Sequence, residues 1–212
     1  MTFLRWCFKV KSMITKKIKF IKSAVLAKDY PPETKPEIAF MGRSNAGKSS
    51  LINNISNKKI AKVSQTPGKT RLLNFFDFEK YILVDMPGYG YASRSGDEIA
   101  DWQTMIEGYL TDRQILAGLV LVMDIRRKWT KEEHILVQFV HTYGRPVVVA
   151  LTKTDKVKKS EIAKLVEQHK KSSKLSAVFA ISNTDGKGFQ EMEEYIYREW
   201  IENFKAFEGH ED

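Results

Sequence analysis

The sequence lacks the features of a secreted or membrane-spanning protein. Its 212 residues include one cysteine, Cys7, so no disulfide can form within the chain, in agreement with a reducing compartment. No apolar run approaches the roughly 20 residues needed to span a bilayer. Lysines also interrupt the apolar residues near the N-terminus, unlike the core of a secretory leader. We therefore expect a cytoplasmic protein without stable membrane insertion.

Acidic residues are missing from the first 28 positions, although the whole chain has 26 of them. This segment carries eight of the nine net positive charges, which leaves the remainder nearly neutral. Such an arm suits a polyanion such as ribosomal RNA, because each phosphate contact releases counterions; a membrane surface or no partner are the alternatives. Interspersed apolar residues indicate that part of the arm packs as an edge strand. The basic residues are Arg5, Lys9, Lys11, Lys16, Lys17, Lys19, Lys22 and Lys28.

The clearest motif is a phosphate-binding loop (P-loop) at residues 42–49, which match the pattern GxxxxGK(S/T) between a strand-like and a helix-like segment. Glycines let the backbone approach a phosphate, and the loop amides and helix N-terminus attract the anion. Lys48 is expected to reach the β- and γ-phosphates, and the Ser49 hydroxyl to bind Mg²⁺. The loop comprises Gly42, Arg43, Ser44, Asn45, Ala46, Gly47, Lys48 and Ser49.

A second motif, Thr152-Lys153-Thr154-Asp155, follows the buried-strand run 146–151 and indicates guanine rather than adenine. Guanine presents two donors, N1–H and the N2 amine, and the Asp155 carboxylate can accept both. The aliphatic stem of Lys153 can lie along the face of the base. Thr152 stands where many proteins of this class have Asn, so an amide is lost but a hydroxyl is kept.

A third motif, DxxG, comprises Asp85, Met86, Pro87 and Gly88 after the strand-like run 81–84. Its aspartate holds Mg²⁺ through water, and the amide of Gly88 senses the γ-phosphate. Between the P-loop and DxxG, either Thr66 or Thr70 could complete the Mg²⁺ coordination when GTP is bound, and sequence order alone does not choose between them.

These motifs and their flanks resemble the EngB family of GTPases, of the Era/TrmE/EngA type, over about residues 17–204. The segments that carry the resemblance are 66–71 (TPGKTR), 74–76 (NFF), 85–92 (DMPGYGYA), 123–126 (MDIR) and 151–156 (LTKTDK). The resemblance implies a small GTPase that binds GTP, GDP and Mg²⁺ and acts in assembly of the large (50S) ribosomal subunit, with defects in cell division and septation on its loss. It assigns the Mg²⁺ threonine to Thr70 and extends the GTP-binding set to Gly68, Lys69, Thr70, Arg71 and Leu72.

The resemblance has departures and open points. The last guanine-contact element falls on Ile181, Ser182 and Asn183, where Ser182 matches the family pattern and Asn183 does not. Lys48, Thr70 and Gly88 are the expected catalytic residues, but Tyr89 stands where Ras-like proteins place a water-orienting glutamine. We therefore expect slow turnover aided by a partner or an ion. Asn45 either binds K⁺, as in related GTPases, or braces the loop by a hydrogen bond.

Alternating strand and helix signals predict an α/β protein: a three-layer P-loop GTPase fold with a mostly parallel sheet, an antiparallel edge hairpin and helices on both faces. We expect a basic arm over 1–30, a monomeric GTPase domain over 31–205 and a frayed tail over 206–212, with Met13 as an alternative start. The predicted strands are 17–23, 36–41, 71–78, 80–85, 117–123, 146–151 and 176–181. The predicted helices are 48–56, 97–112, 131–142, 160–171 and 188–204.

Two competing functions fit parts of the same pattern. One is a P-loop kinase for a small molecule, against which the TKTD motif and the lack of an Arg-rich lid both count. The other is an RNA-binding or membrane-associated switch in which the nucleotide is only structural. The segment Arg126-Arg127-Lys128-Trp129 pairs cations with an aromatic ring, as RNA contacts do, and equally suits an ordinary loop after a strand.

Overall fold

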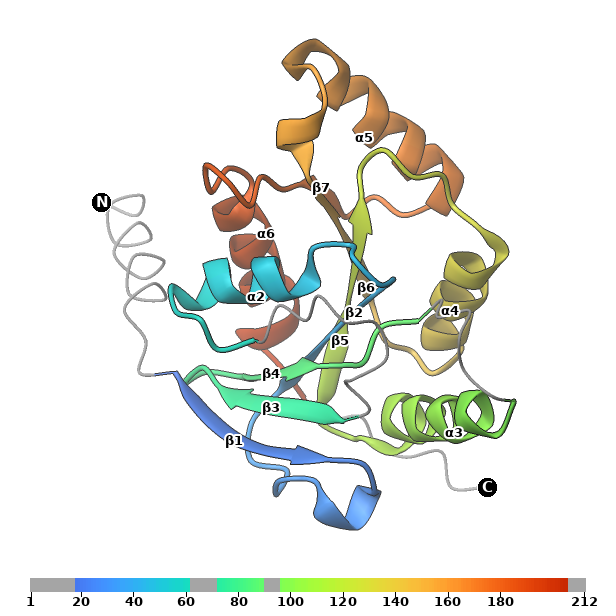
Figure 1. Cartoon of the computed structure of the whole chain (residues 1–212). Helices are drawn as coiled ribbons and strands as arrows, with labels where there is room; N and C mark the ends of the chain where they lie inside the picture. The colour runs from blue at the N-terminus through green and yellow to red at the C-terminus, as the bar shows by residue number, and fades with distance from the viewer. Residues whose placement is uncertain (1–17, 62–71, 90–95, 206–212) are drawn as a thin grey trace.

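A single seven-stranded sheet organises the chain, with strand order β1-β3-β4-β2-β5-β6-β7. The computed structural model describes residues 18–61, 72–89 and 96–205, with 96–102 described by the backbone alone (Figure 1). The strands are β1 (Lys19–Ala24), β2 (Glu37–Gly42), β3 (Leu73–Asp77), β4 (Ile82–Asp85), β5 (Leu116–Asp124), β6 (Val147–Thr152) and β7 (Val178–Ala180). All seven predicted strands are therefore present, and the mostly parallel sheet is confirmed.

Helices cover both faces of the sheet, as predicted. The α-helices are α2 (Lys48–Ser56), α3 (Gly96–Asp112), α4 (Lys131–Thr142), α5 (Lys159–Ser173) and α6 (Phe189–Ile196). Short 3-10 turns η1 (Ala27–Asp29) and η2 (Thr154–Lys156), which no sequence signal predicted, follow β1 and β6. Helices α2 and α6 lie on one face, and α3, α4 and α5 on the other (Figure 1). In the described ranges, no helix is both long and apolar enough to cross a membrane.

The direction of the strands agrees with the predicted hairpin. Strand β3 pairs antiparallel with β4 on one side and with β1 on the other, whereas β2, β4, β5, β6 and β7 pair in parallel. The short connection between β3 and β4 leaves no room for a crossover helix, so the pair must be antiparallel. Strand β1 extends the sheet beyond this hairpin and has β3 as its sheet neighbour.

Alternation along the buried strands builds two cores. In β5, Leu119 and Leu121 face α3, α4 and α5, while Val120 and Val122 face α2 and α6. All four are fully buried, because a central parallel strand is covered on both faces. Tyr109 and Leu110 of α3 belong to the first core.

The C-terminal helix departs from prediction. The expected uninterrupted helix 188–204 is wrong: α6 ends at Ile196 and continues as a π-helical turn, η3 (Tyr197–Ile201). The turn brings Trp200 against Gly118 of β5, where an added Cβ would lie 2.8 Å from the indole ring. The Trp200 ring therefore occupies the space that the missing side chain of Gly118 leaves on the sheet. Helical periodicity, which relates near neighbours in the sequence, does not reveal this contact.

Candidate nucleotide-binding site

The P-loop connects the end of β2 to the start of α2, and its shape depends on Gly47. This residue has φ 90° and precedes the first turn of α2, where no side chain caps the helix. An added Cβ would lie 3.2 Å from both Thr152 Oγ1 and Asn183 Nδ2. Asn45 also has a left-handed backbone, with φ 62°. The loop thus turns tightly beneath uncapped helix amides, an arrangement suited to an oxyanion.

The P-loop and DxxG motifs meet through Lys48 and Asp85. The Lys48 ammonium group forms an ion pair with Asp85 Oδ1, and both side chains are mostly buried. Asp85 ends β4, whose neighbour β2 leads into the P-loop, so parallel pairing places the two motifs at one sheet edge. Met86 is fully buried, and its amide donates to Phe40 O at 3.0 Å, which fixes the start of the DxxG turn to β2.

Thr152 and Lys153 hold the P-loop from the neighbouring strand end. The buried Thr152 hydroxyl hydrogen-bonds to Ala46 O and lies 3.1 Å from Met123 O. This explains how threonine serves where an asparagine is common, since a hydroxyl donor still reaches the P-loop carbonyl. Lys153 Nζ donates to Asn45 O at 2.7 Å. Both contacts join residues more than 100 positions apart in the sequence.

Asp124, at the end of β5, forms a second support for Lys153. Its Oδ2 lies 3.1 Å from Lys153 Nζ, and Arg126 grips both carboxylate oxygens at 2.9 and 2.6 Å. Burial alone would raise the pKa of Asp124, but the hydrogen bonds from Arg126 and Lys153 hold it well below its usual range. A permanently charged carboxylate therefore orients the lysine stem. Asp124 belongs to the segment 123–126 that carries the family resemblance, but no role was predicted for it.

The last predicted element, Ile181 to Asn183, also reaches the P-loop. Ile181 is buried and its amide donates to Leu151 O at 2.7 Å, while Ser182 is buried in a turn with Asp185. Asn183 Nδ2 lies 3.5 Å from Gly47 O, and Asn183 O accepts from Asn54 Nδ2 at 2.9 Å. Asn54 of α2 was not predicted, because a single asparagine on a helix carries no motif signal.

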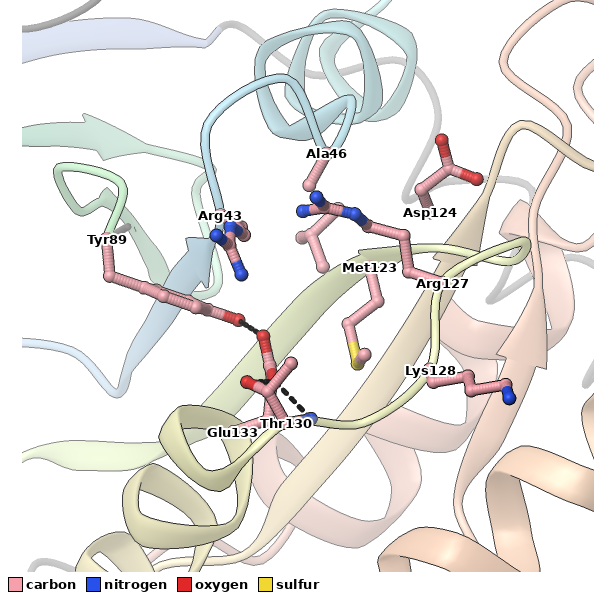
Figure 2. A pocket seen from close by; sticks show the side chains of 10 residues that line it. Arg43, Ala46, Tyr89, Met123, Asp124, Arg127, Lys128, Thr130 and Glu133 are labelled. Carbon is pink, nitrogen blue, oxygen red and sulfur yellow. Dashed lines mark hydrogen bonds between the residues drawn. The ribbon is translucent and has the colours of Figure 1, made fainter. Parts of the chain in front are cut away.

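Tyr89, directly after DxxG, is turned toward α4. Its hydroxyl donates to Glu133 Oε1 at 3.0 Å, as Figure 2 shows, and its carbonyl accepts from Ser44 N at 3.3 Å. Burial, followed by the nearby Glu133 charge, raises the pKa of the Tyr89 hydroxyl, so it stays protonated. Glu133 had no predicted role, although it forms the capping box of α4 with Thr130.

The remaining predicted residues divide by position. Gly68, Lys69, Thr70 and Arg71, together with the alternative Thr66, lie outside the described residues. Leu72 is 39% exposed and directly precedes β3, Asp155 lies in η2, and Gly88 is half-buried. Ser49 is half-buried in the first turn of α2, beside Lys48. The hydroxyl of Ser49 and the carboxylate of Asp85 are hard oxygen donors of the kind that Mg²⁺ prefers, so Ser49 and Asp85 fit the ion.

A mostly parallel sheet whose strand ends unite a P-loop, DxxG and TKxD defines a P-loop GTPase. The family model described as 50S ribosome-binding GTPase matches residues 37–153. A probable GTP-binding protein EngB from Bdellovibrio bacteriovorus is 56% identical over 187 residues, which cover 88% of this chain and 94% of the relative. A second, from Clostridium perfringens, is 44% identical over 195 residues, covering 90% and 99%. The chain belongs to the EngB family of GTPases.

Solved structures agree on the fold. A crystal structure of a probable GTP-binding protein engB superimposes with a TM-score of 0.65 at 23% identity, covering 76% of this chain and 97% of that one. The structure of Era in complex with MgGDPNP and nucleotides 1506–1542 of 16S ribosomal RNA gives 0.63 at 25% identity, covering 82% and 59%. GTPases of this class generally use Mg²⁺.

Proposed function

We propose that this protein binds GTP at the edge of the sheet where β2, β4, β5 and β6 end, and hydrolyses it slowly. The protein acts as a molecular switch, and slow hydrolysis sets how long its GTP-bound state lasts. The observation that carries this proposal is the set of contacts converging on the P-loop, from Asp85, Thr152, Lys153 and Asn183. The site belongs to a GTPase domain over 31–205, preceded by the basic arm over 1–30.

Recognition of the nucleotide follows from these positions. The P-loop amides and Lys48 bind the phosphates, and Asp155 accepts the two guanine donors. Lys153, held between Asn45 O and Asp124, lays its stem along the base. The last guanine-contact element lies against the base on its other side and comprises Ile181, Ser182 and Asn183. When Mg²⁺ is bound, through Ser49 and Thr70, it neutralises charge on the β- and γ-phosphates.

Slow intrinsic hydrolysis follows from Tyr89. Its hydroxyl is engaged by Glu133, and a phenol there cannot orient the attacking water as a glutamine amide would. Lys48 and the amide of Gly88 remain to stabilise the developing negative charge. The Asn45 side chain has no hydrogen bond within the described ranges; the loop contact at this position uses its backbone carbonyl. We propose that a docking partner, or K⁺ held by Asn45, supplies the missing positive charge; bracing of the loop by a hydrogen bond is the alternative role of Asn45.

We propose the large ribosomal subunit precursor as the partner on which this switch acts. The matching family model is described as a 50S ribosome-binding GTPase, and Era, a structural neighbour, has been solved with 16S ribosomal RNA. The excess positive charge of the chain suits an RNA partner. The protein then acts as a monomer in the cytoplasm, and its loss leads to defects in cell division and septation.

Two measurements test this function. Multiple-turnover phosphate release from GTP, with and without 50S particles, should show a slow basal rate that the particles increase. Co-sedimentation with 50S particles in GDP, GTP and a non-hydrolysable analogue should show strongest binding in one nucleotide state. Equal use of ATP would contradict the base assignment, and phosphate transfer to a small molecule would favour the kinase alternative. Nucleotide-independent sedimentation would indicate an RNA-binding protein whose nucleotide is structural.

A further inference from the structure

A pocket of about 270 Å³ lies beside the P-loop, on the side of α4. Its wall and floor come from the P-loop, the DxxG turn, the end of β5 and the start of α4. Lys48, Ser49 and Asp85, which serve the phosphates and Mg²⁺ in the proposed function, do not line it. The lining residues are Arg43, Ala46, Tyr89, Val122, Met123, Asp124, Arg127, Lys128, Thr130 and Glu133.

Cations dominate the mouth of this pocket. Figure 2 shows the guanidinium groups of Arg43 and Arg127 turned toward the same opening, above the side chain of Met123, while the Lys128 side chain points away from it. Among the described residues, Arg43 has one distant ion pair, 3.6 Å from the exposed Glu132. Arg127 and Lys128 are exposed, and their side chains have no ion pair or hydrogen bond within the described part of the chain. A solvated pair like Arg43–Glu132 is weak and can be displaced by a ligand.

The two acidic residues of the pocket do not cancel this charge. Asp124 is already neutralised by Arg126 and Lys153, which lie outside the lining. Glu133 uses one oxygen for the Tyr89 hydroxyl and the other for the amide and hydroxyl of Thr130. Glu133 keeps its negative charge, because its three donors are neutral, but Arg43, Arg127 and Lys128 outnumber it, so the lining stays net positive.

In the basic segment that follows β5, residues 126–129, some side chains are held by contacts within the protein and others are available to a ligand. The guanidinium group of Arg126 donates to both carboxylate oxygens of Asp124. Trp129 donates its Nε1–H to His169 Nδ1 at 3.0 Å and packs its ring 5.2 Å from that of His134, so it is not a free platform for a base. Arg127 and Lys128 remain. The structure therefore points to recognition of a phosphate backbone by cations rather than stacking of a base on the aromatic ring.

We infer that this pocket receives a backbone phosphate of the ribosomal RNA, held between Arg43 and Arg127. This inference rests on the proposed function. Guanidinium groups present paired N–H donors that match phosphate oxygens, so two of them converging on one opening suit a single phosphate. The pocket is smaller than most small-molecule sites, which favours a protruding group of a larger partner over a whole nucleotide. Its rim is exposed and accessible to a macromolecule.

The position of the pocket links this contact to the switch. Tyr89 is both the residue after DxxG and a wall of the pocket, and Arg43 belongs to the P-loop and forms a backbone bridge with Tyr89. A change in the DxxG turn between GDP and GTP would therefore alter the space between the two guanidinium groups. RNA binding through Arg127 is then expected to depend on the nucleotide state.

The test is Arg127→Gln in the full chain, because Arg43 also belongs to the P-loop. Arg198→Gln is the matched control: it removes the same charge from an exposed arginine on η3, which is paired with its neighbour Glu199. We expect Arg127→Gln to weaken co-sedimentation with 50S particles about tenfold and to reduce the slope of log affinity against log salt by about 1. GDP affinity should match wild type. The 50S affinity of Arg127→Lys should lie between those of wild type and Arg127→Gln, since lysine keeps the charge but loses the paired N–H donors of the guanidinium group.

The outcomes separate the inference from the function. If Arg127→Gln sediments as Arg198→Gln does, with an unchanged salt slope, the inference is wrong and the proposed function stands. If no variant, including wild type, binds 50S particles, both are wrong. A competition arm uses inorganic phosphate and a short single-stranded RNA on the GDP-bound protein. Arg127-dependent binding of inorganic phosphate without any effect on RNA would assign the pocket to a small phosphate compound instead.

Discussion

The hydroxyl of Tyr89 donates to Oε1 of Glu133 across 3.0 Å, with both side chains buried. This bond joins the DxxG turn to α4, two elements that no sequence motif links. The same carboxylate caps α4 through Thr130 N at 2.8 Å. Glu133 therefore secures the start of a helix with one oxygen and the residue after DxxG with the other.

Tyr89→Phe tests this relationship. Losing the hydroxyl should lower the free energy of unfolding by about 1 kcal/mol, since Glu133 keeps its Thr130 donors. Intrinsic GTP hydrolysis should change little, because the hydroxyl is turned toward α4. Denaturant unfolding and single-turnover kinetics measure the two effects, with the exposed Tyr143→Phe as control. A large loss of hydrolysis at unchanged stability would show that the phenol acts in the reaction.

Gly47→Ala should abolish nucleotide binding. The substitution meets both a left-handed backbone, φ 90°, and two side-chain atoms at 3.2 Å. Gly186→Ala is the matched control, because φ is +71° there but nothing lies within 4 Å of the added Cβ. Both should lose about 1 kcal/mol of stability from backbone strain. GDP titration should separate them, and equal GDP affinity of the two variants would contradict the role of Gly47.

Asp155→Asn should exchange the base preference. An amide cannot accept both guanine donors, so GTP affinity should fall by about two orders of magnitude while xanthosine triphosphate binds better than to wild type. Equilibrium titration with both nucleotides measures this. Asp185→Asn, in the turn after Ser182, is a carboxylate control that should leave base preference unchanged. If Asp155→Asn still preferred GTP over xanthosine triphosphate as wild type does, Asp155 would not contact the guanine base.

His169 should make stability sensitive to pH. Its Nδ1 accepts from Trp129 at 3.0 Å and its Nε2 faces Ile125 O at 3.1 Å, so the neutral ring with hydrogen on Nε2 satisfies both partners. Burial lowers the pKa of His169 below the unfolded value of about 6.5. The unfolded chain therefore binds more protons in this window, and the free energy of unfolding falls as pH drops from about 7 to about 5.5.

Urea unfolding at several pH values measures this dependence. His169→Asn should flatten the pH dependence between about 7 and 5.5, whereas the exposed His141→Asn should not. Indole fluorescence, to which all four tryptophans contribute, follows unfolding in the same samples. An identical pH profile for wild type and His169→Asn would mean that another group titrates.

Gly118→Ala should destabilise the fold without touching the nucleotide site. The new methyl would meet the Trp200 ring at 2.8 Å and Pro146 O at 2.9 Å. Overpacking of this kind costs about 1–3 kcal/mol. Gly108→Ala, in α3 with its nearest atom at 4.0 Å, should instead stabilise by up to about 1 kcal/mol. Thermal unfolding distinguishes them, and a Gly118→Ala protein as stable as wild type would show that Trp200 can move aside.

The sequence by itself determined the motifs and most of the elements. The P-loop pattern has fixed spacing within one strand–loop–helix unit, so Gly47, Lys48 and Ser49 could be located without the fold. Helices α2 and α4 have the predicted bounds, 48–56 and 131–142, since their apolar periodicity and start signals are local. The hairpin β3–β4 followed from the shortness of its connection. Thr70 and the base contacts of Asp155 stay predictions.

Tertiary structure alone decided which distant side chains serve one another. Asp124 supports Lys153 because β5 and β6 are parallel neighbours, and Tyr89 finds Glu133 because α4 packs beside the P-loop. Gly118 admits Trp200 only because a π-turn ends the last helix. Such contacts join residues far apart in the chain, whereas propensity and periodicity describe near neighbours. Position in space, set by strand order and packing, is the property that one-dimensional patterns do not contain.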